Sequence, residues 1–434
     1  MEKIKVAMIC KASSPEIREN LKLSKLSFSN FLLKLFHQSL ISYSDFAPWV
    51  NSITSNCIDY SDIEMHVVMP HQGVLGKESA FEIGPVYYHV FCEKPNQIFQ
   101  AINRRFLHDR IVKYSRNYRS IQKIIESIDP DLIVLVGAEN PSYSGSVLNI
   151  NNKPVLLLCQ TVFNNEEFKS FYSRSNFEVR CKLEGKIIKK TPYIGCYSDK
   201  HANLLRKNPD VRYLFEFQWP NSKKEVEIPQ GEKKYDFINF ANTMSSQKGY
   251  HDSVLALAKV KKLYPDVKLV LVNHGPMRVQ NELEAIINEN GLQDNVSFVP
   301  FFENREDLFK FLGCVKFGVL PCKVDYISGT MLQSMSRGLP IVVYRTEGTP
   351  TLNDQSECVL ISEMNDIDGL ADNMIRLMSD EELSIRLREN SLRYMAEQSR
   401  RNEGSMNHIV SLFNAVCDNY YKGEPIPDSL LINK

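Results

Sequence analysis

Short apolar runs alternate along the chain with longer segments of helical periodicity. In the first half, the runs that we expect to form strands span residues 4–10, 64–70, 86–92, 131–137, 154–160 and 193–197. In the second half, they span residues 235–241, 267–273, 295–300, 315–320, 339–344 and 358–362. These runs are apolar throughout rather than alternating, which is typical of parallel strands in a sheet that helices cover on both faces.

The segments between these runs favour helices. Their apolar residues recur at helical spacing and fall on one face, as in Val254, Leu257 and Ala258, or in Leu370, Met374 and Leu377. Strand–helix alternation in both halves of the chain predicts an α/β protein with two Rossmann-like, doubly wound sheets.

A polar and charged segment, residues 222–234, contains Pro and Gly and reads as a linker between the two halves. We therefore expect a first domain over residues 1–225 and a second over residues 235–395. A long helical stretch follows the last predicted strand. We expect residues 396–434 to form a C-terminal helix that packs back on the first domain.

Composition narrows the possible functions. The 434 residues fit two domains of about 200 residues each. Lys+Arg and Asp+Glu both total 52, which argues against a dedicated nucleic-acid binder. The 10 cysteines form no C-x-x-C pair and suggest reduced thiols rather than a zinc site or a disulfide framework. The first apolar run is too short for a secretory signal, so we expect a cytoplasmic protein.

Ligands of open parallel sheets bind at the carboxyl ends of the strands, so the loops there carry the candidate chemistry. The loop after strand 235–241 contains Asn242 and Lys248 and leads into a helix. A cation at a helix N-terminus opposes the helix dipole, and a bound diphosphate would relieve this. The alternative is a solvated surface lysine.

The next candidate is the turn at 273–276, after strand 267–273. Its Gly275 permits a tight turn and a close approach of backbone. The alternative is a plain strand-to-helix turn with no ligand.

The loop at 321–340 is the most informative. We expect Ser328, Gly329 and Thr330 to begin a helix that ends at Gly338, and free backbone N–H groups at such a start bind phosphate. Gln333 lies about one turn inside and could reach hydroxyls beside the phosphates. The alternative is a capping box, in which Thr330 and Gln333 only satisfy backbone donors.

With these loops, the second half resembles the group 1, or family 4, glycosyltransferases of the GT-B fold. The likeness covers about residues 235–400 and is weaker in the first half. The family carries two glutamates eight positions apart, and Asp325 and Gln333 stand at the matching positions. The resemblance implies that the first contacts the donor sugar and the second the nucleotide ribose. Lys248 matches a family lysine, while Thr243 replaces an arginine five residues before it.

The resemblance also implies two Rossmann-like domains facing across a cleft, and a reaction. A sugar would move, with retention, from a nucleoside diphosphate sugar to a glycan or lipid-linked acceptor in the synthesis of a surface polysaccharide or glycoconjugate. Lys248 and the amides around Gly329 would stabilise the leaving diphosphate, and Asp325 would orient the sugar. We expect no metal and no cofactor besides the donor. A catalytically degenerate sugar-nucleotide-binding module and a nucleotide-sugar epimerase of the same fold are the alternatives.

The acceptor side is less defined. His71, His89, Glu139 and Gln160 fall near the ends of predicted strands, where each could equally be structural. Glu139 is the preferred catalytic candidate there. Two basic stretches with interleaved aromatic residues, 97–123 and 21–40, suggest peripheral contact with the inner membrane surface. The alternative is a solvated helix face, and the balanced total charge disfavours nucleic acid as a partner.

Overall fold

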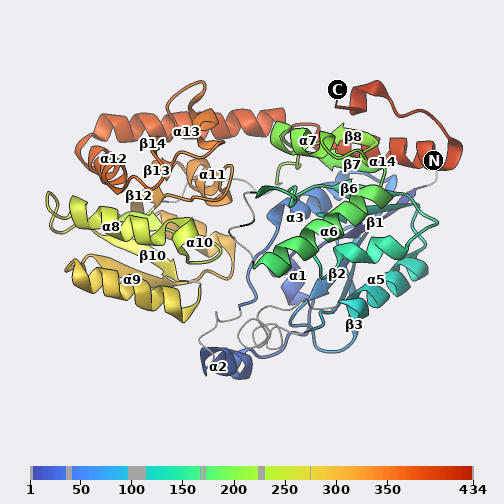
Figure 1. The fold of residues 1–434 in the computed structure, drawn as a ribbon, viewed down its shortest axis with the longest axis horizontal. Helices are drawn as coiled ribbons and strands as arrows, with labels where there is room; N and C mark the ends of the chain where they lie inside the picture. Colours follow the sequence, from blue (N-terminus) through green and yellow to red (C-terminus); the bar gives the residue numbers. More distant parts are fainter. Residues whose placement is uncertain are drawn as a thin grey trace. The chain divides into compact units, whose positions relative to one another are not determined.

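The computed structural model describes residues 3–35, 42–95, 114–166, 169, 173–222, 230–273 and 275–432. The described residues form two compact units, each built on one sheet (Figure 1). The first unit draws on Met1–Lys25, Tyr43–Lys223 and Asn402–Lys434, and the second on Leu26–Ser42 and Lys224–Arg401.

The sheet of the first unit has the strand order β3-β4-β2-β1-β5-β6-β7-β8. Its strands are β1 (Ile4–Ile9), β2 (Ile63–His71), β3 (Glu78–Ile83), β4 (Val86–Cys92), β5 (Leu132–Val136), β6 (Val155–Leu158), β7 (Tyr193–Cys196) and β8 (Tyr213–Glu216). All pairs are parallel except β3 with β4. The sequence pattern missed the two edge strands, β3 and β8. β3 alternates exposed and half-buried positions, because an edge strand lacks cover on both faces, and β8 is short.

Helices cover both faces of this sheet. They are α1 (Pro15–Glu19), α3 (Pro48–Asn56), α5 (Ser115–Ile128), α6 (Arg174–Lys190), α7 (Asp199–Arg206) and α14 (Ser405–Lys422). Val6 of β1 points into a core that includes residues of α3 and α14, while its neighbour Ala7 points into a core with residues of α5, α6 and α7. The apolar runs of the sequence arise from this double burial.

The sheet of the second unit is fully parallel, with the order β11-β10-β9-β12-β13-β14. Its strands are β9 (Tyr235–Asn239), β10 (Leu269–Asn273), β11 (Val296–Pro300), β12 (Val315–Leu320), β13 (Ile341–Tyr344) and β14 (Leu360–Ser362). Its helices are α2 (Ser27–Leu35), α8 (Tyr250–Val260), α9 (Met277–Glu289), α10 (Arg305–Leu312), α11 (Gly329–Ser336), α12 (Ile367–Ser379) and α13 (Glu381–Arg401).

This strand order fixes where a ligand site can form. The chain runs outward from β9 through β10 to β11, and then returns to the other side of β9 to form β12. The loops after β9 and β12 therefore lead to helices on opposite faces of the sheet, α8 and α11, and ligands of such sheets bind at this reversal point of the carboxyl edge. The prediction of two doubly wound α/β sheets is confirmed.

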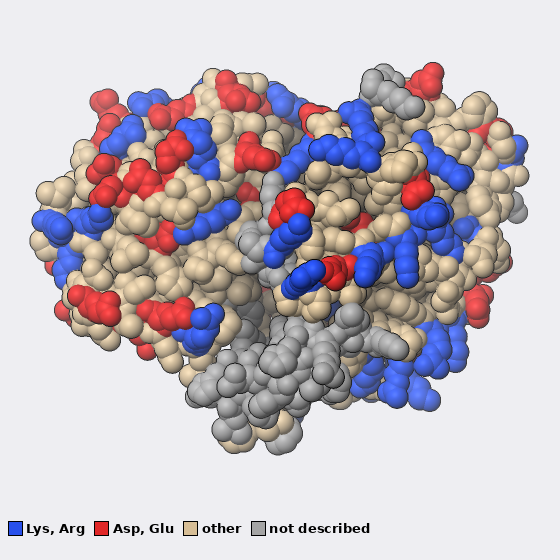
Figure 2. Space-filling model, in the orientation of Figure 1, with Lys and Arg blue, Asp and Glu red and all other residues tan. Residues whose placement is uncertain are grey.

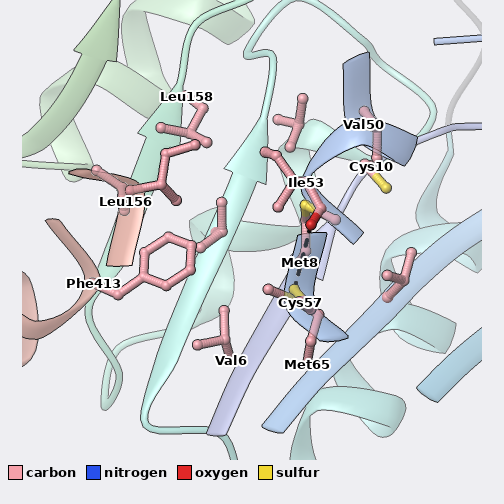
Figure 3. Packing of buried hydrophobic residues seen from close by; sticks show 14 of the residues in the cluster. Val6, Met8, Cys10, Val50, Ile53, Cys57, Met65, Leu156, Leu158 and Phe413 are labelled. Carbon is pink, nitrogen blue, oxygen red and sulfur yellow. Dashed lines mark hydrogen bonds between the residues drawn. The ribbon is translucent and has the colours of Figure 1, made fainter. Parts of the chain in front are cut away.

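Helix α14 lies far from the other elements of the first unit in sequence, but belongs to its core. Phe413, 1% exposed, packs with Val6, Leu156 and Leu158 on the face of the sheet that α3 and α14 cover (Figure 3). Helix α13 continues the second unit to Arg401, so the chain returns to the first unit at Asn402. Within the described residues, no helix is long and apolar enough to cross a membrane.

Replacing Phe413 with Ala should destabilise the first unit by about 3–5 kcal/mol, because a buried aromatic side chain is lost and leaves a cavity. Denaturant unfolding followed by circular dichroism measures this change. The control is Asn414→Ala, one residue along on the exposed face of the same helix. A loss below about 1 kcal/mol for Phe413→Ala would contradict a core position for α14.

Candidate functional site

Loops at the carboxyl edge of the second sheet pack tightly against one another. Gly249 has a φ of 74°, and a Cβ added there would lie 2.3 Å from the carbonyl oxygen of Pro321. The amide of Lys323 donates to the carbonyl of Gln247 at 2.9 Å. The loops after β9 and β12 are thus fixed against each other at the point where the strand order reverses.

Two further loops join this arrangement through glycines. A Cβ at Gly275, after β10, would lie 2.8 Å from the carbonyl oxygen of Met244, so the close backbone approach predicted at Gly275 is made to the loop after β9. A Cβ at Gly348, after β13, would lie 2.4 Å from the carbonyl oxygen of Tyr326. The loops after β10, β9, β12 and β13, four neighbouring strands of the sheet, therefore pack against one another at its carboxyl edge.

An ion pair lies at the centre of these loops. The Nζ of Lys248 is 2.5 Å from Oδ2 of Asp325, and the side chains are 20% and 37% exposed. Burial lowers the pKa of the Lys248 ammonium, but the neighbouring Cys322 and Asp325 outweigh it, so the pKa is raised above its ordinary value. The structure thus brings together two residues that the sequence suggested for separate parts of a donor.

Lys248 keeps capacity for a ligand. Its Nζ also lies 3.7 Å from Sγ of Cys322, and an ammonium group has three N–H donors. Because the pair is partly exposed, an incoming anion can reach the ammonium group. Asn242, at the start of the same loop, is exposed.

The first turn of α11 carries the second feature of the site. Ser328 is the N-cap, and its hydroxyl accepts from the amide of Thr330 at 3.3 Å. The amide of Thr330 is therefore not free, contrary to our expectation. The amide of Gly329 has no partner within the described ranges, and a Cβ at Gly329 would meet nothing within 4 Å. The helix N-terminus thus offers one N–H donor with no partner among the described residues, at a glycine with room for a close approach.

The capping-box alternative for Gln333 is wrong. Because Ser328 caps the helix, the third helical position is Met331, and Gln333 lies two positions beyond it. Gln333 is half-buried, and no hydrogen bond of its side chain is found within the part of the chain described. Its amide is thus free to meet a ligand.

The sequence analysis missed a second ion pair in these loops. The Nζ of Lys323 is 2.7 Å from Oδ2 of Asp252, which lies in the first turn of α8 and is 6% exposed. The hydroxyl of Tyr344 donates to the same carboxylate oxygen at 2.7 Å. Lys323 therefore brings a second cation to a site in which Thr243 stands where the family has arginine. Its loop position was visible in the sequence, but its partner 71 positions away was not.

In the first unit, Glu139 lies just after β5, next to β1, where the strand order of that sheet reverses. Glu139 is 8% exposed, and burial, reinforced by the carboxylate of Glu184, raises its pKa to about 7. Gly137 has a φ of 80°, and a Cβ there would lie 2.9 Å from both carboxylate oxygens of Glu139. The glycine thus makes room for a buried carboxyl group.

Amide groups hold one oxygen of this carboxyl group. Asn140 donates to Oε1 of Glu139 at 3.0 Å. With its amide nitrogen turned to Glu139, Gln160 lies 3.2 Å from Oε1 and accepts from the indole N–H of Trp49 at 2.9 Å. Oε2 of Glu139 has no hydrogen-bond partner in the described part of the chain. Glu139 and Gln160 are thus brought together.

The two histidines named with them have other surroundings. His71 is buried and accepts from the amide of Gly73, and burial, with the charge of Lys11, lowers its pKa to about 4. His89 lies within β4, and its Nε2 is 3.1 Å from Nδ1 of His66 on β2. His89 was expected near the end of a strand and instead pairs, within β4, with His66 of the neighbouring strand β2.

Other expectations fall partly outside the structure. The side chains of Asn273 and His274, residues 97–113 of the basic stretch 97–123, and residues 36–40 of the basic stretch 21–40 lie outside the described residues. Among the residues that are described, no three His, Cys, Asp or Glu side chains come together as a metal site would require.

Comparison with known proteins supports the resemblance of the second half of the chain to a glycosyltransferase family. The sequence pattern of the family described as "Glycosyl transferases group 1" matches residues 221–394. The N-acetyl-alpha-D-glucosaminyl L-malate synthase of Bacillus anthracis is 29% identical over 222 residues, which are 49% of this chain and 55% of that protein. The chain spans about half the length of the curated relatives it matches.

Solved structures extend the likeness over both units. Sucrose-phosphate synthase from Thermosynechococcus elongatus matches with a TM-score of 0.68 at 13% identity, over 97% of this chain and 100% of that one. Anabaena HepE in complex with UDP-glucose matches with a TM-score of 0.60 at 12% identity, over 94% and 99%. Residues 221–394 are thus similar to the group 1 glycosyl transferases, and the chain has the GT-B fold of two Rossmann-like α/β domains.

Proposed function

We propose that the protein transfers a sugar, with retention, from a nucleoside diphosphate sugar to a glycan or lipid-linked acceptor. The observation that carries the proposal is the Lys248–Asp325 pair at the switch point of the second sheet, in the loop that leads to the free amide of Gly329 four residues after Asp325. This combination offers a cation and a helix N-terminus to a diphosphate, and a carboxylate to a sugar.

The reaction depends on the charge that develops as the bond to the diphosphate breaks. The ammonium of Lys248 and the amide of Gly329 stabilise the negative charge on the leaving group. When the diphosphate contacts Lys248, the carboxylate of Asp325 becomes available to the sugar. That carboxylate orients the sugar and favours positive charge on its ring. Gln333 donates to hydroxyl groups next to the phosphates.

The donor class is supported by a structural relative. Anabaena HepE, which shares the fold, was solved in complex with UDP-glucose. We propose a UDP-sugar as the donor, with Lys248, Asn242, Gly275, Ser328, Gly329, Thr330 and Gln333 around it. Lys323 serves as the second cation near the phosphates in place of the missing arginine.

Glu139 is our candidate on the acceptor side. A carboxyl group with a pKa near 7 exchanges protons readily at neutral pH, as a group handling an acceptor hydroxyl requires. Its free oxygen, Oε2, is the atom that would contact this hydroxyl. A buried carboxyl group with no structural partner for one oxygen is costly, which favours a role in function.

A basic surface of the first unit supports contact with anionic lipid. Arg116, Arg119 and Lys123 are exposed on α5, and Lys182, Lys186 and Lys189 are exposed on one face of α6. Figure 2 shows Lys and Arg side chains gathered over α5 and α6. Such a surface would hold the enzyme near a lipid-linked acceptor.

The proposal is tested by incubating the full chain with a panel of nucleotide sugars and acceptors and detecting products by mass spectrometry. A sugar-extended acceptor, or slow hydrolysis of one donor, is expected. Donor binding with no turnover on any acceptor would instead favour the degenerate binding module, and an altered sugar on the intact nucleotide would favour an epimerase.

Lys248→Ala should raise the dissociation constant of the donor about tenfold to a hundredfold, because one charge-assisted contact of about 1.5–3 kcal/mol is lost. Isothermal titration calorimetry measures the change. Lys259→Ala is the matched control, since Lys259 of α8 also pairs with an aspartate, Asp368 of α12. Equal donor affinity in wild type and Lys248→Ala would remove Lys248 from the site.

Gln333→Glu should tighten donor binding about fivefold, because an ionised acceptor forms stronger hydrogen bonds with ribose hydroxyls than a neutral amide does. The same titration applies, with Gln293→Glu as a control that adds equal charge at an exposed position. If both variants bind the donor alike, Gln333 does not contact it.

Glu139→Gln should change how stability depends on pH. The carboxyl pKa rises from 4.5 to about 7 on folding, so the folded state holds its proton more tightly than the unfolded state. The contribution of this carboxyl group to the free energy of unfolding is fully present below pH 4.5 and is lost as the pH rises through 7. The free energy of unfolding therefore falls by about 3 kcal/mol between these conditions. The variant lacks this loss and should be more stable than wild type at pH 8, but not at pH 4.

The measurement is the free energy of unfolding at both pH values. Glu216→Gln, an exposed carboxylate at the end of β8, should follow the wild type. The proposal for Glu139 also requires that transfer activity fall in Glu139→Gln. Parallel pH profiles for wild type and Glu139→Gln would show that Glu139 titrates normally.

A further inference from the structure

A second cavity lies in the second unit, at the opposite edge of its sheet from the donor site. The cavity has a volume of about 300 Å³ and is lined by Lys233, two residues before β9, by the start of β12 and by the turn that leads into β13. The first turns of α13 close it on one side. Since all strands of this sheet are parallel, these amino ends lie away from the loops that hold Lys248 and Asp325.

Cations dominate the lining of this cavity. Lys233, Lys316, Arg337 and Arg388 contribute to it, against one carboxylate, Glu381. Lys316 is neutralised by Asp236 at 2.8 Å, outside the cavity lining. Arg337 stacks on the ring of Phe309, with 3.8 Å between the guanidinium carbon and the ring centroid. Lys233 and Arg388 remain as the cations that can meet a ligand in the cavity.

Lys233 and Arg388 are the cations of the lining that form no ion pair with a described carboxylate. Lys233 donates to the carbonyl of Val315 at 2.9 Å, and Arg388 has no hydrogen bond or ion pair to any described residue. Burial, and then the charge of Arg388, lower the pKa of Lys233 below its ordinary value. Two like charges are therefore held near each other at a cost that a bound anion would remove.

The backbone directs Arg388 to this place. Gly338 has a φ of 65°, and a Cβ there would lie 3.2 Å from both Cγ and Nε of Arg388. The arginine thus crosses the glycine just beyond the C-terminus of α11. A cation at a helix C-terminus is favourable in itself, but that interaction needs only one charge.

We propose that this cavity is a second anion site, which binds a small phosphate-bearing ligand through Arg388 and Lys233. The planar guanidinium of Arg388 matches two phosphate oxygens, and the ammonium of Lys233 neutralises a further charge. The volume lies at the lower end of small-molecule pockets and so selects a compact phosphorylated group. The site does not depend on the proposed transferase reaction, since it shares no residue with the donor site.

Pyrophosphate is a suitable probe, titrated by calorimetry into the full chain carrying Lys248→Ala, which weakens the proposed donor site. In that background, Arg388→Gln and Lys233→Gln should each weaken binding about tenfold. Arg386→Gln is the matched control, because Arg386 lies on the same helix but pairs with Glu357 outside the cavity. Its affinity should equal that of the background.

The outcomes separate this proposal from the function proposed above. Loss of binding on Lys248→Ala alone, with no further effect of Arg388→Gln, would leave the donor site standing and overturn the second site. Equal weakening by Arg386→Gln and Arg388→Gln would also overturn it, because general charge would then explain the binding. Arg388 is exposed, so unchanged thermal melting of the variant should exclude unfolding.

A second arm identifies the source of the phosphate. Sedimentation with phosphatidylcholine vesicles is compared with and without phosphatidylglycerol. Arg388-dependent binding to the anionic vesicles supports a lipid headgroup, whereas Arg388-dependent binding of pyrophosphate alone supports a free phosphorylated solute. If neither probe binds in a manner that depends on Arg388, the proposal is wrong.

Discussion

The contact between Lys248 and Asp325 links the two loops that leave neighbouring strands β9 and β12. The two loops lead to helices on opposite faces of the sheet because the strand order reverses between β9 and β12. The ion pair joins the loops at this reversal point. A partly exposed ion pair contributes little to stability. It does, however, hold a cation and a carboxylate in place before a ligand arrives, and so reduces the cost of organising the site.

The first unit shows a different use of a carboxyl group at an equivalent place in its sheet. Glu139 also follows a strand beside the reversal point, but is almost completely buried. Gly137, in a left-handed conformation, leaves space that any other residue would fill. The second carboxylate oxygen of Glu139, Oε2, has no hydrogen-bond partner among the described residues, in contrast to the buried carboxylate of Glu184, which accepts from the amides of Phe163 and Asn164.

The elements that the sequence predicted best are those buried on both faces. Central strands such as β5 and β12 were placed to within a residue or two, because continuous burial requires continuous apolar residues. The edge strand β3 was missed because it is only half covered. Local pattern was also ambiguous at the start of α11, where Ser328 and Thr330 both resemble caps and only the backbone geometry distinguishes them.

Pairings across long sequence separations were beyond prediction from pattern. Lys323 and Asp252 lie in different loops, and nothing in their local sequence indicates that they meet. The hydrogen bond that Gln160 donates to Glu139, and the one that Gln160 accepts from Trp49, likewise join residues from separate elements. Residue types therefore indicated which loops form the candidate site of the second half. Which lysine pairs with which aspartate in those loops became clear only from the folded structure.

Helix α14 has a consequence for how the chain matures. The strands of the first unit are synthesised early, yet Val6 and Leu156 obtain part of their cover only from a helix translated after the whole second unit. Until then, an apolar face of a nearly complete sheet stays in contact with water or with chaperones. Biogenesis of the N-terminal half is thereby tied to completion of the polypeptide, and premature termination would leave an aggregation-prone product rather than an independent domain.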